Sequence, residues 1–391
     1  MRKKISLSAG IAFVIGLLCV YVTAAAGHNS TGVMLSSYID FYHLTSASQG
    51  LPGSMESIGL LSSIVLCGLL LVVMKKHNAL LLVSALMPVS LVLIGLQPPF
   101  PVLCGAYVLF GLAYGCMDSL SSSLISDLYP ADSPRIMGYV RAVFGLGGLL
   151  LPVVMTAMLH AGLSWNRVLF IMGICGLLLI LTYFLLGHRT LDPAQISSPR
   201  DSFSPRNILT FLRTPGAIGV FLFCLCYGGH QIGLTVWIIR YITTYMSATS
   251  LGEYALTLFW GGAFFSRLIL PGLIHSHRIH VVYGNILAAV LLTAGLLTRS
   301  GLVLCILMPF VGFAEGSTIP MLVDYACGLD RSRSAIASSI IVLGNNIGGT
   351  VVPLLIGLLI SAIGPETGIY ILPALALGAA GIAAISVKKR G

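Results

Sequence analysis

Long apolar runs dominate the sequence, and each is close to the length that an α-helix needs to cross a lipid bilayer, about 20 residues. Such runs recur twelve times in 391 residues, separated by short turn or charge signals. Charged residues make up only 8% of the chain, whereas a soluble domain carries about 25%. This composition excludes an ordinary soluble enzyme and a disordered chain. We therefore expect an all-α, polytopic membrane protein with twelve transmembrane helices.

The runs form two groups of six, divided by a polar stretch rich in Ser, Pro, Asp and Arg. The first six are predicted near 5–36, 49–74, 78–96, 100–126, 134–160 and 164–187. The last six are predicted near 212–244, 249–274, 279–298, 301–326, 333–362 and 367–387. We predict an N-terminal six-helix bundle over 1–187, a cytoplasmic linker over 188–206 and a C-terminal six-helix bundle over 207–391.

The basic residues indicate how the helices are oriented. Placing the N-terminus in the cytoplasm assigns 17 of the 21 Lys and Arg residues to cytoplasmic segments, and only Arg167 and Arg299 to outside loops. An excess of basic residues marks the cytoplasmic side, so we interpret the net charge of +9 as a topology signal and not as a nucleic-acid-binding surface. We expect a monomer in the plasma or inner membrane of a bacterium, with both termini cytoplasmic.

The two halves share a repeat, because three motifs of the first half recur in the second after 201 or 202 residues. The matched motifs are Gly111-x-x-x-Gly115 with Gly312-x-x-x-Gly316, Gly147-Gly148-x-x-x-Pro152 with Gly348-Gly349-x-x-x-Pro353, and Gly27-His28-Asn29 with Gly229-His230-Gln231. Small residues let membrane helices approach closely. Parallel repeats of six helices build transporters whose site lies near the membrane midplane between the halves.

With this organisation the chain resembles the major facilitator superfamily, and within it the fucose-permease-like branch of sugar transporters. The residues that carry the resemblance are Gly115 to Ser119, Phe144 to Pro152, Tyr227 with Trp237 and Tyr241, Phe259 to Arg267, and Gly344 to Pro353. The resemblance covers nearly the whole chain. It implies two pseudo-symmetric bundles, alternating access, and proton-coupled transport of a sugar or similar solute.

Asp118 is the first candidate for proton coupling. It lies about twelve residues, or about 18 Å of helix, from the turn at Tyr129 and therefore near the middle of the bilayer. Desolvation at that depth disfavours the charged form of a carboxyl group, as a proton carrier requires. The resemblance supports this role, because the family associates a carboxylate at this motif position with proton coupling. The alternative is a structural ion pair with Arg141.

Arg141 departs from the family pattern, which places a neutral His or Gln at this point of the fifth helix, where sugar hydroxyls are bound. A guanidinium group is planar, always charged and suited to carboxylate or phosphate. Arg141 therefore either binds an anionic solute or pairs with Asp118 or Asp127.

The repeated histidines, His28 and His230, are expected to face one pseudo-symmetric cavity. Asn29 and Gln231 beside them can each donate and accept hydrogen bonds, which suits a polyhydroxylated solute. The alternative for each is packing within its bundle. The family often carries an acid one turn beyond this asparagine and another at the position of Gln231, whereas this chain has Gly32 and an amide.

Three further residues complete the candidate site. Glu315 lies in a stretch from Gly312 to Pro320 that should kink the helix, and it is either a second proton site or the partner of a cation. Trp237 and Trp260 could stack on a sugar ring, although aromatic residues in membrane helices also serve packing or lipid contact.

We therefore expect a secondary transporter, not an enzyme, that carries a small polar solute together with protons. Two alternatives remain open: a carrier of a small organic anion bound by Arg141, and a proton-antiport exporter of drugs or metabolites. No cofactor or metal is expected, because the nine cysteines form no Cys-x-x-Cys pair and lie mostly in apolar runs.

Overall fold

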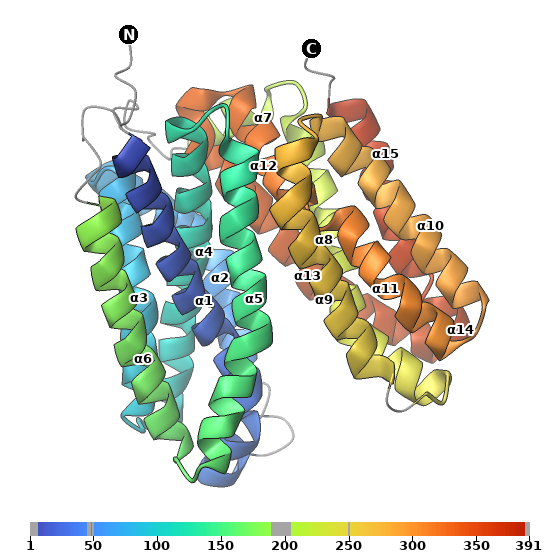
Figure 1. The fold of residues 1–391 in the computed structure, drawn as a ribbon, viewed down its shortest axis with the longest axis horizontal. Helices are drawn as coiled ribbons and strands as arrows, with labels where there is room; N and C mark the ends of the chain where they lie inside the picture. Colours follow the sequence, from blue (N-terminus) through green and yellow to red (C-terminus); the bar gives the residue numbers. More distant parts are fainter. Residues whose placement is uncertain (1–6, 45–47, 49–50, 189–204, 249–250, 388–391) are drawn as a thin grey trace. The chain divides into compact units, whose positions relative to one another are not determined.

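A computed structural model of the chain describes residues 7–44, 48, 51–188, 205–248 and 251–387 (Figure 1). Every regular element in this part of the chain is a helix. Twelve helical segments among the described residues are long and apolar enough to cross a membrane. The predicted fold class is confirmed.

The first six spanning segments follow the predicted runs closely. They are α1 Leu7–Tyr42, α2 Leu51–Val73, α3 Lys76–Gly95, α4 Phe100–Leu128, α5 Ser133–His160, and α6 Trp165–Thr182 with the π-helix η1 Tyr183–His188. The largest difference is at the end of α1, which continues six residues past the predicted end at 36. The added turns place Tyr38 and Phe41 against Trp165, with ring centroids 5.1 and 5.3 Å from the indole.

The second half contains more breaks than its apolar runs predicted. Its elements are α7 Pro205–Leu212, α8 Ala217–Arg240, η2 Tyr241–Tyr245, α9 Leu251–Leu273, η3 Ile279–Tyr283, α10 Gly284–Leu297, α11 Gly301–Glu315, α12 Thr318–Leu329, η4 Arg331–Arg333, α13 Ser334–Ile363, α14 Pro365–Gly368 and α15 Ile371–Ser386. The turn between α7 and α8 includes Gly216, whose φ of +93° lies in the left-handed region that favours glycine. The seventh span therefore begins at Ala217 and not at the predicted 212.

The chain groups by its contacts into two compact units. Met1–Pro130 and Val143–Ser204 form the first, and Ala131–Ala142 and Pro205–Gly391 form the second. The predicted boundaries of the two bundles stay a prediction, and residues 189–204 of the predicted linker lie outside the described residues.

Repeated glycines mark the closest helix contacts inside both units. A Cβ atom at Gly111 of α4 would lie 2.1 Å from the carbonyl oxygen of Glu56 on α2. A Cβ atom at the equivalent Gly312 of α11 would lie 2.0 Å from the carbonyl oxygen of Phe259 on α9. Only glycine allows two helix backbones to approach this closely, so the repeat in the sequence corresponds to the same kind of helix crossing in each unit.

Each unit also carries an ion pair at repeat-equivalent positions 76 and 277. Lys76 Nζ at the start of α3 lies 2.9 Å from Asp127 Oδ2 near the end of α4. His277 Nε2, just before η3, lies 2.8 Å from Asp324 Oδ2 on α12. Asp127, which the sequence offered as one possible partner of Arg141, thus lies against Lys76.

Candidate functional site

A break in the tenth spanning segment positions the most deeply buried acid. The helix α11 ends at Glu315, and α12 begins at Thr318. Pro320 has no N–H group, so it cannot bond to the carbonyl of Gly316 as the next turn of a continuous helix would. The break lies within the stretch where the sequence predicted a kink, and it places Glu315 at a helix end.

Side chains of α8 and α9 satisfy the backbone groups that this break frees. Tyr227 donates its hydroxyl hydrogen to the carbonyl of Glu315 at 3.2 Å, and Arg267 donates from Nε to the carbonyl of Gly316 at 3.0 Å. The N–H of Ser317 donates to Ser266 Oγ at 3.1 Å. An unsatisfied backbone group costs several kcal/mol in lipid, so these contacts stabilise the break.

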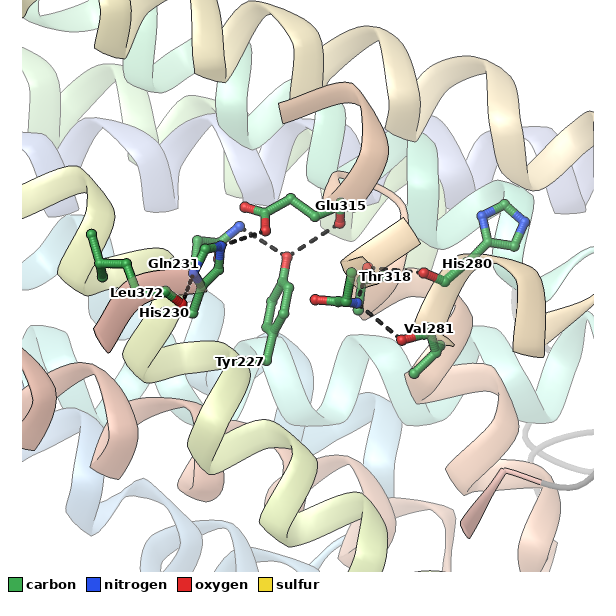
Figure 2. Close-up of polar contacts among 9 residues, drawn as sticks. Tyr227, His230, Gln231, His280, Val281, Glu315, Thr318 and Leu372 are labelled. Atoms are coloured by element: carbon green, nitrogen blue, oxygen red, sulfur yellow. Dashed lines mark hydrogen bonds and ion pairs between the residues drawn. The ribbon is translucent and has the colours of Figure 1, made fainter. Parts of the chain in front are cut away.

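Glu315 forms a closed pair with His230 in the interior of the second unit (Figure 2). Glu315 Oε2 lies 2.8 Å from His230 Nε2, and both side chains are 0% exposed. His230 Nδ1 lies 2.9 Å from the carbonyl of Leu372 on α15. A carbonyl only accepts, so Nδ1 carries a hydrogen, and the contact between Nε2 and Oε2 must contain a second one. Glu315 Oε1 makes no hydrogen bond with any described residue.

Gln231 belongs to the same polar network. Its Nε2 donates to the hydroxyl oxygen of Tyr227 at 3.0 Å, and Tyr227 in turn donates to the carbonyl of Glu315. Figure 2 shows these side chains meeting at the break. The structure thus brings together three predicted site residues, His230, Gln231 and Glu315, and adds Tyr227 as the group that joins them.

The two predicted tryptophans have different surroundings. Trp237 donates from Nε1 to the carbonyl of Pro353 at 3.0 Å and is partly buried against the core of the second unit. Trp260 lies beneath Arg267, with the guanidinium carbon 5.6 Å from the ring centroid. Trp260 is therefore close to the break that holds Glu315, because Arg267 contacts both, whereas Trp237 is engaged with α13.

In the first unit, Asp118 on α4 is half-buried and accepts a hydrogen bond from Tyr21. The hydroxyl of Tyr21 on α1 lies 3.0 Å from Asp118 Oδ1 and 2.8 Å from Ser121 Oγ. Arg141 lies on α5 and groups by its contacts with the second unit, whereas Asp118 belongs to the first. The pairing of Asp118 with Arg141 stays a prediction.

His28 also pairs with a carboxylate, and this one comes from α2. His28 Nδ1 lies 2.6 Å from Glu56 Oε1, and Thr31 donates its hydroxyl hydrogen to Glu56 Oε2 at 2.9 Å. The side chain of Glu56 is 5% exposed and that of His28 is 46% exposed. The neighbouring Asn29 donates from Nδ2 to the carbonyl of Ala25 on its own helix at 2.8 Å.

Two aromatic rings lie beside His28. Tyr114 of α4 and Phe144 of α5 are stacked, with centroids 5.6 Å apart and ring planes 9° from parallel. The centroid of the His28 ring is 5.7 Å from that of Tyr114 and 6.0 Å from that of Phe144. The residues around His28 therefore offer a carboxylate, a hydroxyl and two π-faces.

Sequence reasoning gave no role to Glu56, the one acid in the second apolar run. It gave no site role to Tyr21, which donates to Asp118, and it named Tyr227, which donates to the carbonyl of Glu315, only among the residues that carry the family resemblance. A tyrosine in an apolar run gives no signal of its own. The lone acid in the second run was the available signal, because a carboxylate at that depth needs a partner.

The candidate site therefore consists of carboxylates inside helical bundles, each with an imidazole or phenol against it. A charge at the centre of a bilayer costs about 3 kcal/mol on insertion scales. Such groups can gain and lose protons when their access to water changes. Among the described residues, no group of three or more His, Cys, Asp or Glu side chains could hold a metal ion.

A family model described as Major Facilitator Superfamily matches residues 17–329. Protein TsgA from Salmonella paratyphi B is 24% identical over 216 residues, which cover 54% of this chain and 52% of that protein. The chain thus spans about half the length of the curated relatives it matches.

Two solved structures are similar over nearly the whole chain. FucP in the outward conformation, the E. coli fucose:proton symporter, has a TM-score of 0.76 at 15% identity, covering 98% of this chain and 100% of that one. The proton:xylose symporter XylE has a TM-score of 0.76 at 15% identity, covering 97% of each chain. At these identities the likeness shows the fold.

Proposed function

Because the chain belongs to the Major Facilitator Superfamily and is a membrane transporter, we propose that it carries a sugar or sugar-like solute by alternating access, in symport with protons. Two observations support this proposal. Its structural neighbours include a fucose:proton and a proton:xylose symporter, and each of its units holds a buried carboxylate against a titratable partner.

The pair of Glu315 and His230 is the main observation that supports proton coupling. Both side chains are sealed from solvent, and Glu315 Oε1 has no hydrogen-bond partner among the described residues. A carboxylate in such surroundings is costly unless a proton neutralises the pair. We assign proton coupling to Glu315 and to Asp118, which lies half-buried on α4 and accepts a hydrogen bond from Tyr21.

The solute-binding residues of this proposal are those with hydrogen-bonding or stacking groups at bilayer depth. They are His28, Asn29, Arg141, His230, Gln231, Trp237 and Trp260. Of these, His28 is the most open, with 46% of its side chain exposed. His230 and Gln231 are engaged within the second unit, so they would have to exchange these partners to contact a solute.

Thermal unfolding of the purified protein against a panel of neutral sugars, polyols, sugar acids and carboxylates tests the solute class. A ligand at 100 times its Kd stabilises the folded state by about 2.7 kcal/mol. The proposal expects stabilisation by neutral sugars, with L-fucose and D-xylose as the first probes. Stabilisation by organic anions alone would contradict it.

Asp118→Asn and Glu315→Gln test the coupling in proteoliposomes. Each variant is expected to lose accumulation driven by a pH gradient, because neither amide can release a proton, while solute exchange at equal pH persists. Ser57→Ala is a suitable control, since among the described residues its hydroxyl bonds the carbonyl of Gly53 on its own helix. If both amide variants accumulate solute like the wild type, the coupling assignment is wrong.

An organic anion is the second candidate solute, and Arg141 is the residue that favours it. An arginine at bilayer depth is costly and matches carboxylate geometry with two parallel hydrogen bonds. If the anion is the solute, Arg141→Gln abolishes its uptake. If a neutral sugar is carried by Arg141→Gln as by the wild type, Arg141 is not a solute ligand.

A further inference from the structure

The pair of His28 and Glu56 differs from the sealed pair of His230 and Glu315 in one respect that bears on its chemistry. Both histidines occupy the repeated Gly-His motif, and each lies against a carboxylate from another helix. The side chain of His230 is 0% exposed, whereas that of His28 is 46% exposed. Only the pair in the first unit is therefore open on one side.

The hydrogen bonds around Glu56 define the protonation of His28. Thr31 donates to Oε2, and His28 Nδ1 lies 2.6 Å from Oε1, so both oxygens are in contact with a donor group. A carboxylate that accepts at both oxygens is favoured in its charged form. Nδ1 then carries the hydrogen, and Nε2 of the neutral imidazole presents its lone pair away from Glu56. A buried carboxylate selects a histidine tautomer in this way in many proton-transfer sites.

Two aromatic rings flank His28 without replacing its contact with Glu56. The centroids of Tyr114 and Phe144 lie 5.7 and 6.0 Å from that of the imidazole, and both rings are tilted to it, by 44° and 39°. The carboxylate of Glu56, in direct contact with Nδ1, is therefore the group that stabilises a positive charge on the imidazole.

We propose that His28 is a proton-binding group of the transporter and that Glu56 is its positioning residue. With Nε2 unprotonated, the pair carries one negative charge. A proton from water that binds to Nε2 makes the pair neutral, and its release restores the charge. A neutral pair can be enclosed at bilayer depth at much lower cost than a charged one, so proton binding would favour the conformation in which this side of the unit closes. The inference rests on the proposed proton coupling.

Within the part of the chain that the structure describes, few titratable groups face the pair from the surrounding helices. The helix α2 presents Glu56, α4 presents the phenols of Tyr107 and Tyr114, and α5 presents the uncharged ring of Phe144. Tyr107 lies 3.3 Å from Ser30 Oγ and 2.8 Å from the hydroxyl of Tyr38, so it belongs to a neighbouring hydrogen-bond cluster. Among the described residues, Glu56 is the one carboxylate in hydrogen-bond contact with His28.

Nitrogen-15 NMR of the full chain in nanodiscs tests the proposal without any need for a transported solute. The nine histidines are labelled, and His28 is assigned from the signal that is lost in His28→Gln. At alkaline pH the wild type is expected to show a protonated Nδ1 and a bare Nε2. Glu56→Gln should turn this single tautomer into a mixture, because an amide can either accept from or donate to Nδ1. Ser57→Ala, also on α2, should leave the signal unchanged.

Transport provides the second measurement. In His28→Gln, proton-driven accumulation, measured relative to solute exchange at equal pH in the same variant, should fall by about tenfold or more, equivalent to about 1.4 kcal/mol. A wild-type His28 protonated at Nε2 in its neutral form, or a Glu56→Gln spectrum identical to that of the wild type, would overturn the positioning role. Undiminished accumulation in His28→Gln would overturn the proton-binding role. If no solute is carried at all, the proposed transport function fails, while the tautomer measurement still decides the role of Glu56.

Discussion

Two adjacent glycines of α9, Gly261 and Gly262, should respond to alanine in opposite ways. Figure 1 shows α9 and α11 next to each other in one unit. A Cβ atom at Gly262 would lie 1.9 Å from the carbonyl oxygen of Pro309 and 2.9 Å from the backbone nitrogen of Phe313, both on α11. A Cβ atom at Gly261 would have no neighbour within 4 Å. Comparing the two alanine variants therefore separates the free-energy cost of disturbing the contact between α9 and α11 from the effect of replacing glycine by alanine in a helix.

The expected size follows from two opposing terms. Alanine favours the helix by about 1 kcal/mol over glycine, and this gain is shared by both positions. At Gly262 the Cβ atom lies well inside the ~3.3 Å of an ordinary carbon–oxygen contact, so the two backbones must separate. Overpacking of this kind costs about 1–3 kcal/mol. Because the gain from alanine is shared, we expect Gly261→Ala to be neutral or stabilising and Gly262→Ala to be less stable than it by about 1–3 kcal/mol.

Thermal unfolding of both purified variants, followed by tryptophan fluorescence, measures this difference. At about 2–4 °C per kcal/mol, the unfolding midpoint of Gly262→Ala should lie about 2–12 °C below that of Gly261→Ala. Equal midpoints, or a lower midpoint for Gly261→Ala, would refute the close contact between α9 and α11.

Three further predictions concern the polar contacts. Tyr227→Phe removes the hydroxyl that joins Gln231 to the carbonyl of Glu315 and should lower the stability of the folded protein by about 1–3 kcal/mol. Tyr283→Phe, at a position that is 58% exposed, should have little effect, and thermal unfolding compares the two variants. Lys76→Met removes the ammonium beside the nearly buried Asp127 and should destabilise the folded protein by about 3–5 kcal/mol. The double variant Lys76→Met/Asp127→Leu should recover most of this loss, and a double variant no more stable than the single one would argue against the ion pair. Burial alone would raise the pKa of Asp330, but hydrogen bonds from Ser332 and Arg333 outweigh this effect and hold that pKa below its usual value. The ionised carboxylate of Asp330 therefore stabilises the folded state above the unfolded-state pKa of about 3.9. This stabilisation is lost as the pH falls through the folded-state pKa. Asp330→Asn should therefore lower stability by about 0.5–1 kcal/mol near pH 7 and by progressively less as the pH falls below about 4, and a difference that is constant with pH would contradict this.

The features that could be predicted from the sequence are those set by local composition. Length and hydropathy alone located the spanning helices, because a helix must satisfy all its backbone groups to cross a bilayer. Gly111 and Gly312 were identifiable as helix contacts because small residues at a spacing of four lie on one face. The break after Glu315 followed from Pro320, which removes a backbone hydrogen bond.

The features that could not be predicted depend on which way a side chain points. His28 and His230 are equivalent in sequence, yet His28 meets Glu56 of α2 and His230 meets Glu315 of α11. The depth of a residue in the membrane follows from counting along a run, but its direction around the helix axis follows only from packing. The same holds for Trp237, whose indole N–H is bonded to the carbonyl of Pro353, while its role as a solute ligand stays a prediction.

The central claim is that solute and protons cross together, and solute-driven proton movement measures this directly. The full chain is reconstituted in liposomes that contain a pH-sensitive dye, and the sugar that gives the strongest thermal stabilisation is added outside with no imposed pH gradient. Symport predicts that the lumen acidifies as the solute enters, and that Asp118→Asn abolishes this acidification while solute exchange continues. Entry of solute into wild-type liposomes at constant luminal pH would contradict the account.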